Sequence, residues 1–291
     1  AGPVIVRPGK AVESFMVSDA ALIFGDPTVD AVVETLGGLD PAYSYGMRAL
    51  EAGKHFITAN KVMVASHGLE LAALAREKGA AFLFSAACGG GVPFLHNLAL
   101  SAETDRIEAV SGILNGTTNY MLDAMQRRGL SYGDALREAQ SLGYAESDPT
   151  ADVSGLDALR KMQLACAVAF GVLPQSGMLC EGMEHFTAAD VEDIQSRGLV
   201  CRLMARGSRA GESGSAYVEP VLFPRAAPES SVFTNNNMAS YTGKRCGSIV
   251  LMGQGAGRFP TASAVLRDLS AAQQGARSMF PENCRAAEAD N

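Results

Sequence analysis

The sequence has no tryptophan, no cysteines in CxxC spacing and no cluster of basic residues. Without CxxC spacing, and with only four dispersed histidines, the common zinc-finger and thioredoxin-like patterns are excluded. The formal charge is −7, so no basic region is available to neutralise the phosphates of a nucleic acid or an anionic membrane surface. We therefore expect a small-molecule partner, and neither a nucleic-acid nor a membrane partner.

Long apolar runs are also missing. No stretch reaches the roughly 18 residues that a membrane-spanning helix needs, and the start of the chain has no charged-then-apolar signal pattern. The six cysteines mostly lie within apolar runs, which is typical of reduced, buried thiols. A cytoplasmic location is the expectation that follows.

What is present is an ordinary globular composition with two patterns along the chain. Strand-like runs at 4–6, 30–36, 55–59 and 80–86 are followed by helical stretches with closing glycines, which predicts parallel strands and crossover helices. From residue 106 onward a strand precedes three helical segments.

Strand-like stretches then recur at 199–205, 215–223 and 247–252, and the Pro- and Ser-rich segment 223–237 reads as a loop. A helix with Pro near its start follows GQGAGRF. This second pattern predicts an α/β or α+β lobe.

The segment GYAESDPTADVSGLDALRK (143–161) contains the most informative charges. Residues four apart on a helix share a face, so Asp157 and Lys161 can touch. Such pairs mostly decorate solvated surfaces. Here, however, an acidic loop with Glu146, Asp148 and Asp152 precedes the pair, and this convergence suggests a polar small-molecule pocket. A lysine there can give a proton to an oxygen that becomes negative during reduction, and Glu146 can accept hydrogen bonds from a substrate ammonium group.

Other motifs are less specific. TANK (58–61) follows a strand, where ligands gather in parallel sheets, although a lone lysine there is more often a solvated loop residue. The glycine-rich stretches LGG (36–38), CGGGVP (88–93) and GQGAGRF (253–259) lack the GxGxxG spacing and read as turns by spacing alone. In NGTTNY (115–120), Thr117 or Thr118 either caps the following helix or offers hydrogen bonds to a substrate.

Together, GILNGTTNYML, GYAESDPTADVSGLDALRK, TANKVMVASHGLEL and GQGAGRFPTASAV closely resemble the homoserine dehydrogenases, in the family's order and approximate separations. The resemblance runs from about Val29 to about Leu269. It implies NAD(P)-dependent interconversion of L-homoserine and L-aspartate 4-semialdehyde by hydride transfer, with NADP or NAD as cofactor, in threonine, methionine and isoleucine biosynthesis. It also implies a homodimer formed through the second lobe.

The resemblance further implies roles for individual residues. Lys161 is similar to the family's catalytic acid/base, Asp157 to its companion, and Lys61 to the catalytic lysine near nicotinamide and substrate. Arg7, with Lys10, lies where an NADP 2′-phosphate could be met, but a polar turn explains both residues equally well. The implied substrate-binding residues are Glu146, Gly116, Thr117 and Tyr144, and the implied cofactor-binding residues are Lys61, Leu36, Gly37, Gly38, Gly255 and Arg7.

Two features depart from the family pattern. The chain starts at AGPVIVRPGK, which resembles the family's second strand, so the first strand and its GxGxxG loop are missing. An enzyme, a non-catalytic truncated homologue unable to bind dinucleotide, and a related reductase of another amino-acid aldehyde remain the alternatives. Ser85 stands where the family has a glutamate ligand of a structural monovalent cation, which leaves backbone carbonyls at Cys88 and Gly90 as sodium-like donors.

The predicted fold class is therefore α/β, with an incomplete Rossmann-type dinucleotide-binding lobe and an α+β catalytic and dimerisation lobe. The predicted bounds are 1–92 for the first lobe, completed by 253–280, then 93–252 for the second lobe and 281–291 for a frayed polar tail.

Overall fold

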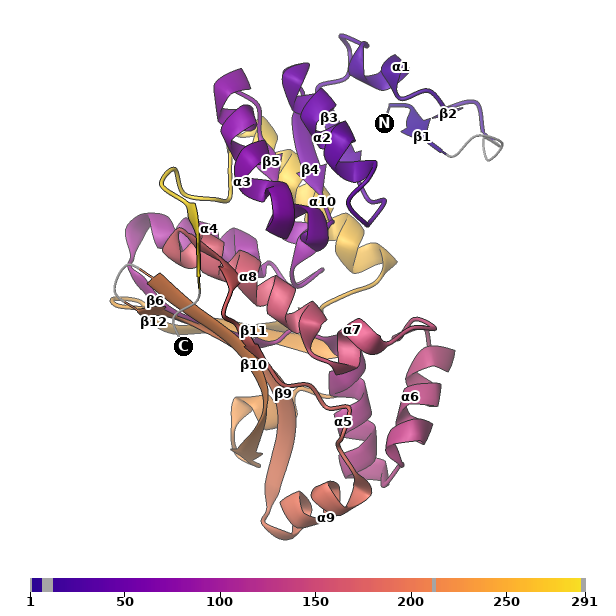
Figure 1. Ribbon diagram of the computed structural model, residues 1–291, viewed down its shortest axis with the longest axis vertical. Coiled ribbons are helices and arrows are strands. Elements are labelled where there is room, and N and C mark those ends of the chain that lie inside the picture. Colours follow the sequence, from indigo (N-terminus) through magenta and orange to yellow (C-terminus); the bar gives the residue numbers. More distant parts are fainter. Residues whose placement is uncertain (1, 7–12, 211–212, 289–291) are drawn as a thin grey trace. The chain divides into compact units, whose positions relative to one another are not determined.

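The computed structural model describes residues 2–6, 13–210 and 213–288, and the chain divides into two compact units (Figure 1). Unit 1 runs to Phe84 and adds Val265–Met279, whereas unit 2 runs from Ser85 to Ala264 and adds the segment from Phe280 onward. These boundaries differ from the predicted ones at 92 and 253. The reason is that the glycine-rich loops CGGGVP (88–93) and GQGAGRF (253–259) contact each other in unit 2, where Gly91 N donates to the Gln254 carbonyl at 3.0 Å.

Unit 1 contains the predicted parallel sheet, in the order β3-β4-β5. α2 packs against α3 and against β4, as expected for crossover helices. The short strands β1 and β2 form a separate parallel pair. The elements are β1 (Val4–Ile5), β2 (Met16–Val17), α1 (Ala21–Phe24), β3 (Ala31–Glu34), α2 (Ala42–Glu51), β4 (His55–Thr58), α3 (Lys61–Lys78), β5 (Phe82–Leu83) and, from Val265 onward, α10 (Arg258–Gln273).

The outer edge of β3 is open among the described residues, because its only strand partner there is β4. A cavity of about 730 Å³ runs along this edge, and its lining includes β3, residues 2–5, and Leu269 and Gln273 of α10. The unpaired strand edge leaves backbone groups of β3 without a sheet partner on that side.

Unit 2 is built on a six-stranded sheet in the order β12-β11-β6-β9-β10-β8, antiparallel except for the β10–β8 pair. α8 packs against β6, β9 and β10, and α4 packs against α8 and β11. The elements are η1 (Ser85–Ala87), α4 (Phe94–Thr104), β6 (Ile107–Ile113), α5 (Gly116–Arg128), α6 (Tyr132–Ser141), α7 (Thr150–Val153), α8 (Leu156–Phe170), β7 (Val172–Ser176), β8 (Leu179–Cys180), α9 (Ala188–Ser196), β9 (Leu199–Ala210), β10 (Ser213–Pro224), η2 (Pro228–Ser231), β11 (Asn236–Gly243), β12 (Gly247–Gln254) and β13 (Arg285–Glu288).

α8 explains how the charged pair of the sequence comes to be inside the protein. The helix begins after Gly155 and ends at Gly171, both in the left-handed conformation that favours glycine. Most of its residues are buried, including Leu164 and Cys166, because the sheet and α4 cover them. Charged residues on such a helix must find partners, since burying an unpaired charge is costly.

Two expectations for unit 2 were wrong. The segment 223–237 is not a loop throughout, because it contains η2 and the first residues of β11, an inner strand between β6 and β12. The tail after Pro281 is not frayed over 285–288, because β13 pairs in parallel with β7. In both places hydrogen bonds to distant strands override a polar local composition.

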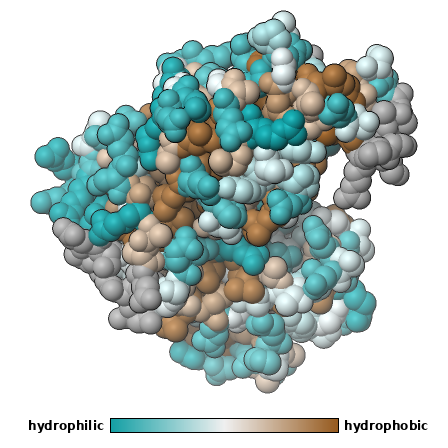
Figure 2. Space-filling model, turned by 45° about the horizontal axis from the view of Figure 1, so that its top comes forward, coloured by the Kyte–Doolittle hydropathy of each residue, from teal (hydrophilic) through white to brown (hydrophobic). Residues whose placement is uncertain are grey.

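On the face in Figure 2, hydrophobic residues (brown) are interspersed with hydrophilic ones (teal). Among the described residues, no helix combines the length and the apolar character needed to cross a membrane. The six cysteines are free thiols, of which Cys88, Cys166 and Cys201 are buried, whereas Cys246 is exposed, contrary to the expectation for a core residue.

Candidate active site

A buried ion pair on α8 forms the centre of the candidate site. Lys161 Nζ donates to Asp157 Oδ2 at 2.7 Å, and the two side chains are only 12% and 11% exposed. The same ammonium donates to the Leu114 carbonyl, also at 2.7 Å, just beyond the end of β6. The predicted contact is thus confirmed, and its burial distinguishes it from an ordinary surface pair.

Asn115 connects this pair to the start of α5. Its Oδ1 accepts from Thr118 N at 2.8 Å and thereby caps the helix, so of the two alternatives for Thr117 and Thr118 the structure does not bear out capping. Its Nδ2 donates to Asp152 Oδ1 at 2.7 Å and to Asp157 Oδ2 at 2.9 Å. One amide therefore satisfies an orphan helix N–H and bridges two carboxylates.

Thr117 and Asp152 complete the cluster. Thr117 Oγ1 lies 2.6 Å from the Tyr144 carbonyl and 3.1 Å from Asp152 Oδ2, and its single hydroxyl proton can be donated to either acceptor. Burial raises the pKa of Asp152, and the Asp157 charge adds to this effect, while the hydrogen bonds from Asn115 and Thr117 oppose it. The cluster brings two carboxylates and one ammonium together, so it carries excess negative charge when all three are ionised.

The ammonium form of Lys161 is favoured in this environment. Burial by itself would lower the pKa of Lys161, but the adjacent Asp157 carboxylate, which is also its hydrogen-bond acceptor, holds that pKa above the ordinary 10.5. Lys161 is therefore protonated at neutral pH.

This raised pKa predicts an alkaline loss of stability. A group whose pKa is higher in the folded state stabilises the fold fully below its unfolded pKa of about 10.5 and loses this contribution as pH rises through the folded value. We expect the free energy of unfolding of the wild type to fall above about pH 10.5 more steeply than that of the double variant Asp157→Asn/Lys161→Met. Urea unfolding of both proteins at each pH provides the measurement, and parallel curves would contradict the assignment.

Asn115 offers a second prediction. Asn115→Ser keeps a good cap residue but removes the amide that bridges Asp152 and Asp157, and a hydrogen bond to a charged group contributes about 1.5–3 kcal/mol. We expect a loss of roughly 2–3 kcal/mol in urea unfolding. Ser131→Ala is the matched control, because Ser131 caps α6 without touching the cluster and should cost about 1 kcal/mol. Equal losses in both variants would exclude the bridging role.

The structure does not bring every predicted residue into the cluster. The Glu146 side chain is exposed and forms no hydrogen bond or ion pair with another described residue, while its carbonyl accepts from Gln140. Asp148 is also exposed and accepts from Thr150. Gly116 is the first residue of α5, and the Tyr144 ring packs edge-on against Tyr120.

In unit 1 the predicted cofactor residues lie at the carboxyl ends of β3 and β4. The loop at Leu36 and Gly37 is held by Glu34, a buried carboxylate that accepts from both backbone N–H groups and from the Thr58 hydroxyl. Lys61 is the first residue of α3. Sequence reasoning missed Glu34, although a charged residue closing a strand before a glycine pair was a visible signal.

Sequence reasoning also missed the structural role of Asn60. It caps α3 through Met63 N (3.1 Å), and its amide donates to the Gly38 carbonyl at 2.6 Å, so TANK holds the LGG loop in place. Gly37 and Gly38 have φ values of 73° and 74°, and nothing lies within 4 Å of where a Cβ would be. The glycines are required by backbone conformation, and space beside them remains open to a ligand.

In unit 2, Gly90 and Gly255 lie in close contact with each other. A Cβ on Gly90 would lie 2.4 Å from the Gly255 carbonyl oxygen, and one on Gly255 would lie 2.0 Å from Asn237 Cγ. Asn237 is buried, and neither its Oδ1 nor its Nδ2 has a hydrogen-bond partner. Cys88 is buried in the turn before Gly90. The described residues contain no cluster of three or more His, Cys, Asp or Glu suited to a metal, and Arg7 and Lys10 lie outside them.

A parallel βαβ unit with a shaped loop at its strand ends is typical of dinucleotide-binding domains, and here a second unit holds a buried lysine–carboxylate cluster. Residues 93–270 match the homoserine dehydrogenase family model, and residues 10–85 match the model of the homoserine dehydrogenase NAD binding domain. The chain belongs to the homoserine dehydrogenase family.

The individual relatives agree. The chain is 40% identical over 269 residues to homoserine dehydrogenase of Corynebacterium glutamicum, covering 90% of this chain and 60% of the relative, and 37% identical over 256 residues to that of Bacillus subtilis, covering 88% and 59%. A crystal structure of the enzyme from Thiobacillus denitrificans superposes with a TM-score of 0.87 at 35% identity, covering 94% of this chain and 67% of that one. A hyperthermophilic archaeal homoserine dehydrogenase in complex with NADPH gives 0.76 at 28% identity, covering 92% and 77%. The chain thus spans about 60% of the length of these two sequence relatives.

Proposed function

We propose that this protein interconverts L-homoserine and L-aspartate 4-semialdehyde with NADP or NAD as the hydride carrier. The observation that carries the proposal is the buried cluster of Lys161, Asp157 and Asn115, which lies within the part of the chain that matches the family model. A lysine held at a fixed position by two acceptors and left protonated is suited to acid/base work on a carbonyl oxygen.

Lys161 is the proposed acid/base. Two of its three N–H donors are directed to Asp157 and to the Leu114 carbonyl, which leaves the third for a substrate oxygen. In reduction the ammonium gives its proton to the aldehyde oxygen as that oxygen gains negative charge. In oxidation the neutral amine takes the hydroxyl proton, so alcohol oxidation should accelerate as pH rises toward the raised pKa of Lys161. Asp157 is the proposed positioning residue for Nζ.

Substrate selection is proposed to involve Glu146 and the start of α5. The exposed Glu146 carboxylate is available to accept hydrogen bonds from the ammonium group of an amino acid. Gly116 and Thr117 contribute backbone and hydroxyl groups, and Tyr144 belongs to the same loop as Glu146.

The residues of unit 1 fit a dinucleotide. Leu36, Gly37 and Gly38 present an open backbone loop at the carboxyl end of a parallel strand, where ligands of such sheets bind. Lys61 at the start of α3 adds a positive charge there, and we place it beside the cofactor and substrate. Gly255 is the proposed cofactor contact of unit 2. The nicotinamide supplies or accepts the hydride, and the NADPH complex of the archaeal relative supports this choice.

Three further assignments complete the proposal. Backbone carbonyls of Cys88 and Gly90 are the proposed donors for a structural monovalent cation. A homodimer is proposed to form through unit 2, whose edge strand β12 exposes Val250 and Met252. A cytoplasmic location is proposed because all six cysteines are free thiols.

The test is the absorbance of the nicotinamide when the folded protein meets L-homoserine with NAD or NADP. We expect reduced cofactor to accumulate with L-homoserine and not with other hydroxy amino acids. A folded protein that gives no signal with either cofactor would instead favour a non-catalytic homologue.

A further inference from the structure

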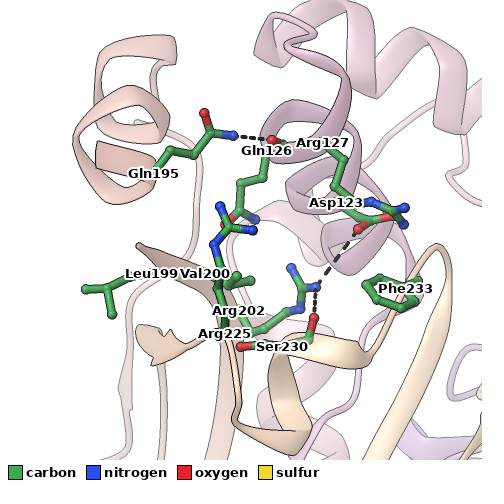
Figure 3. A pocket seen from close by; sticks show the side chains of 10 residues that line it. All are labelled: Asp123, Gln126, Arg127, Gln195, Leu199, Val200, Arg202, Arg225, Ser230 and Phe233. Carbon is green, nitrogen blue, oxygen red and sulfur yellow. Dashed lines mark hydrogen bonds and ion pairs between the residues drawn. The ribbon is translucent and has the colours of Figure 1, made fainter. Parts of the chain in front are cut away.

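A cavity in unit 2 is lined by several charged residues and shares no lining residue with the Lys161 cluster. Its volume is about 260 Å³, and its walls come from α5, the end of α9, β9, η2 and the segments before and after η2 (Figure 3). Neither the acid/base chemistry nor the cofactor residues of the proposed function make use of it. The cavity therefore needs an explanation of its own.

Three guanidinium groups and a single carboxylate line this cavity, namely Arg127, Arg202, Arg225 and Asp123. The sum of these charges is positive, in a protein whose formal charge is −7. Arginine binds oxyanions through its planar, fork-like array of donors, so this lining favours a small oxyanion.

The three arginines differ in how far the protein already engages them. Arg202 is buried and donates to the carbonyls of Cys201, Glu229 and Ser230 at 3.1–3.3 Å. It therefore fixes η2 to β9 as well as lining the cavity. Arg127 lies over the Phe233 ring at 4.6 Å and forms an ion pair with Asp123, at 3.8 Å from Oδ2. Arg225 is exposed, forms no hydrogen bond or ion pair with another described residue, and points toward the side chain of Gln126 in Figure 3.

Asp123 is the residue of this cavity that can discriminate between oxyanions. Its side chain is 11% exposed and Oδ2 accepts from Thr234 N at 3.2 Å, but Oδ1 is buried without a hydrogen-bond partner. The Arg202 guanidinium lies 4.0 Å from Oδ1, which is too long for a hydrogen bond. A buried acceptor of this kind is costly unless a ligand or water donates to it.

We propose that this cavity binds inorganic hydrogen phosphate. The deprotonated oxygens of the ion accept from Arg127 and Arg225, and its remaining P–OH group donates to Asp123 Oδ1. Sulfate has similar size and charge but carries no proton at neutral or alkaline pH, so it would place bare oxygens against the carboxylate. Phosphomonoesters lose their second proton at a pKa of about 6 and meet the same repulsion at pH 8.

The experiment is calorimetric titration of the whole protein at pH 8 and constant ionic strength with phosphate, sulfate and glycerol phosphate. We expect phosphate to bind at least about tenfold more tightly than the other two, the factor that one charge-assisted hydrogen bond supplies. Asp123→Asn should weaken phosphate and strengthen sulfate, so that the preference disappears. Arg225→Gln should weaken phosphate about tenfold, and Arg137→Gln, an exposed arginine outside the cavity, should leave it unchanged.

Three results would overturn the proposal: no phosphate binding by the wild type, equal binding of sulfate and phosphate, or phosphate binding that Arg225→Gln leaves intact. Arg225→Gln keeps the test decisive if Asp123→Asn folds poorly, because Arg225 is exposed and its loss leaves no buried group unpaired. Phosphate held elsewhere on the protein would respond to neither cavity variant.

Discussion

Replacing Lys161 with methionine is expected to lower kcat for L-homoserine oxidation roughly 10²–10⁴-fold, the usual contribution of a positioned acid/base group. Methionine fills similar space but carries no proton, so the developing charge on the substrate oxygen loses its partner. Initial rates of nicotinamide absorbance change, with each substrate varied in turn, give kcat and KM. We expect kcat to carry most of the loss, because the proton is transferred only in the transition state.

The control must separate chemistry from folding. Lys161→Met alone leaves Asp157 as a buried carboxylate without its cation, and breaking a buried pair costs about 3–5 kcal/mol. Asp157→Asn/Lys161→Met removes both charges together, so this double variant should fold and still be inactive. Arg160→Met, the adjacent position on α8, serves as the matched substitution and should retain activity. A folded double variant within tenfold of wild-type kcat would exclude Lys161 as the acid/base.

Gly255→Ala is expected to reduce the free energy of unfolding by about 3 kcal/mol, the upper part of the range for overpacking a core. The new Cβ would fall 2.0 Å from Cγ of Asn237, which is 1% exposed and has no space to move away. Urea unfolding followed by far-UV circular dichroism measures the loss. Gly129→Ala is the control: Gly129 has φ 69° with nothing near its Cβ position, so it should lose only about 1 kcal/mol from backbone strain.

A double-mutant cycle tests the stated cause. Asn237→Ala removes the atoms that the new Cβ would strike, and the Asn237 amide has no hydrogen-bond partner to lose. Gly255→Ala/Asn237→Ala should therefore be more stable than Gly255→Ala alone, with a favourable coupling of about 2 kcal/mol. Additive losses would show that the collision does not explain the glycine, and that Gly255 is required for another reason, such as cofactor contact.

Local rules predicted much of unit 1 and the key pair of unit 2. Parallel strands with crossover helices follow from alternating apolar runs and closing glycines, and β3, β4 and β5 lie within the predicted runs. The contact of Asp157 with Lys161 follows from helix geometry, because residues four apart share a face. The apolar run that continues along α8 favours the burial of this pair.

Other parts of the fold and of the site depend on long-range contacts, which the sequence does not reveal. The bonds of Asn115 reach 37 residues to Asp152 and 42 residues to Asp157, and no periodicity reports such partners. The polar composition after Pro281 predicts a frayed tail, because β7, the pairing partner of β13, is remote in sequence. The convergence expected of the acidic loop holds for Asp152, which joins the cluster, but not for the exposed Glu146.

Sequence alone was sufficient for the family, the helix face of the Asp157–Lys161 pair and the two-lobe plan, since these rest on short motifs and on periodicities of neighbouring residues. Tertiary folding was needed for the capping and bridging role of Asn115, for the tight Gly90–Gly255–Asn237 contact, and for the arginine-lined cavity with its unpartnered Asp123 oxygen. The physical reason is that hydrogen-bond satisfaction and close packing are properties of groups brought together in space. No local pattern records which distant group will fill a given position.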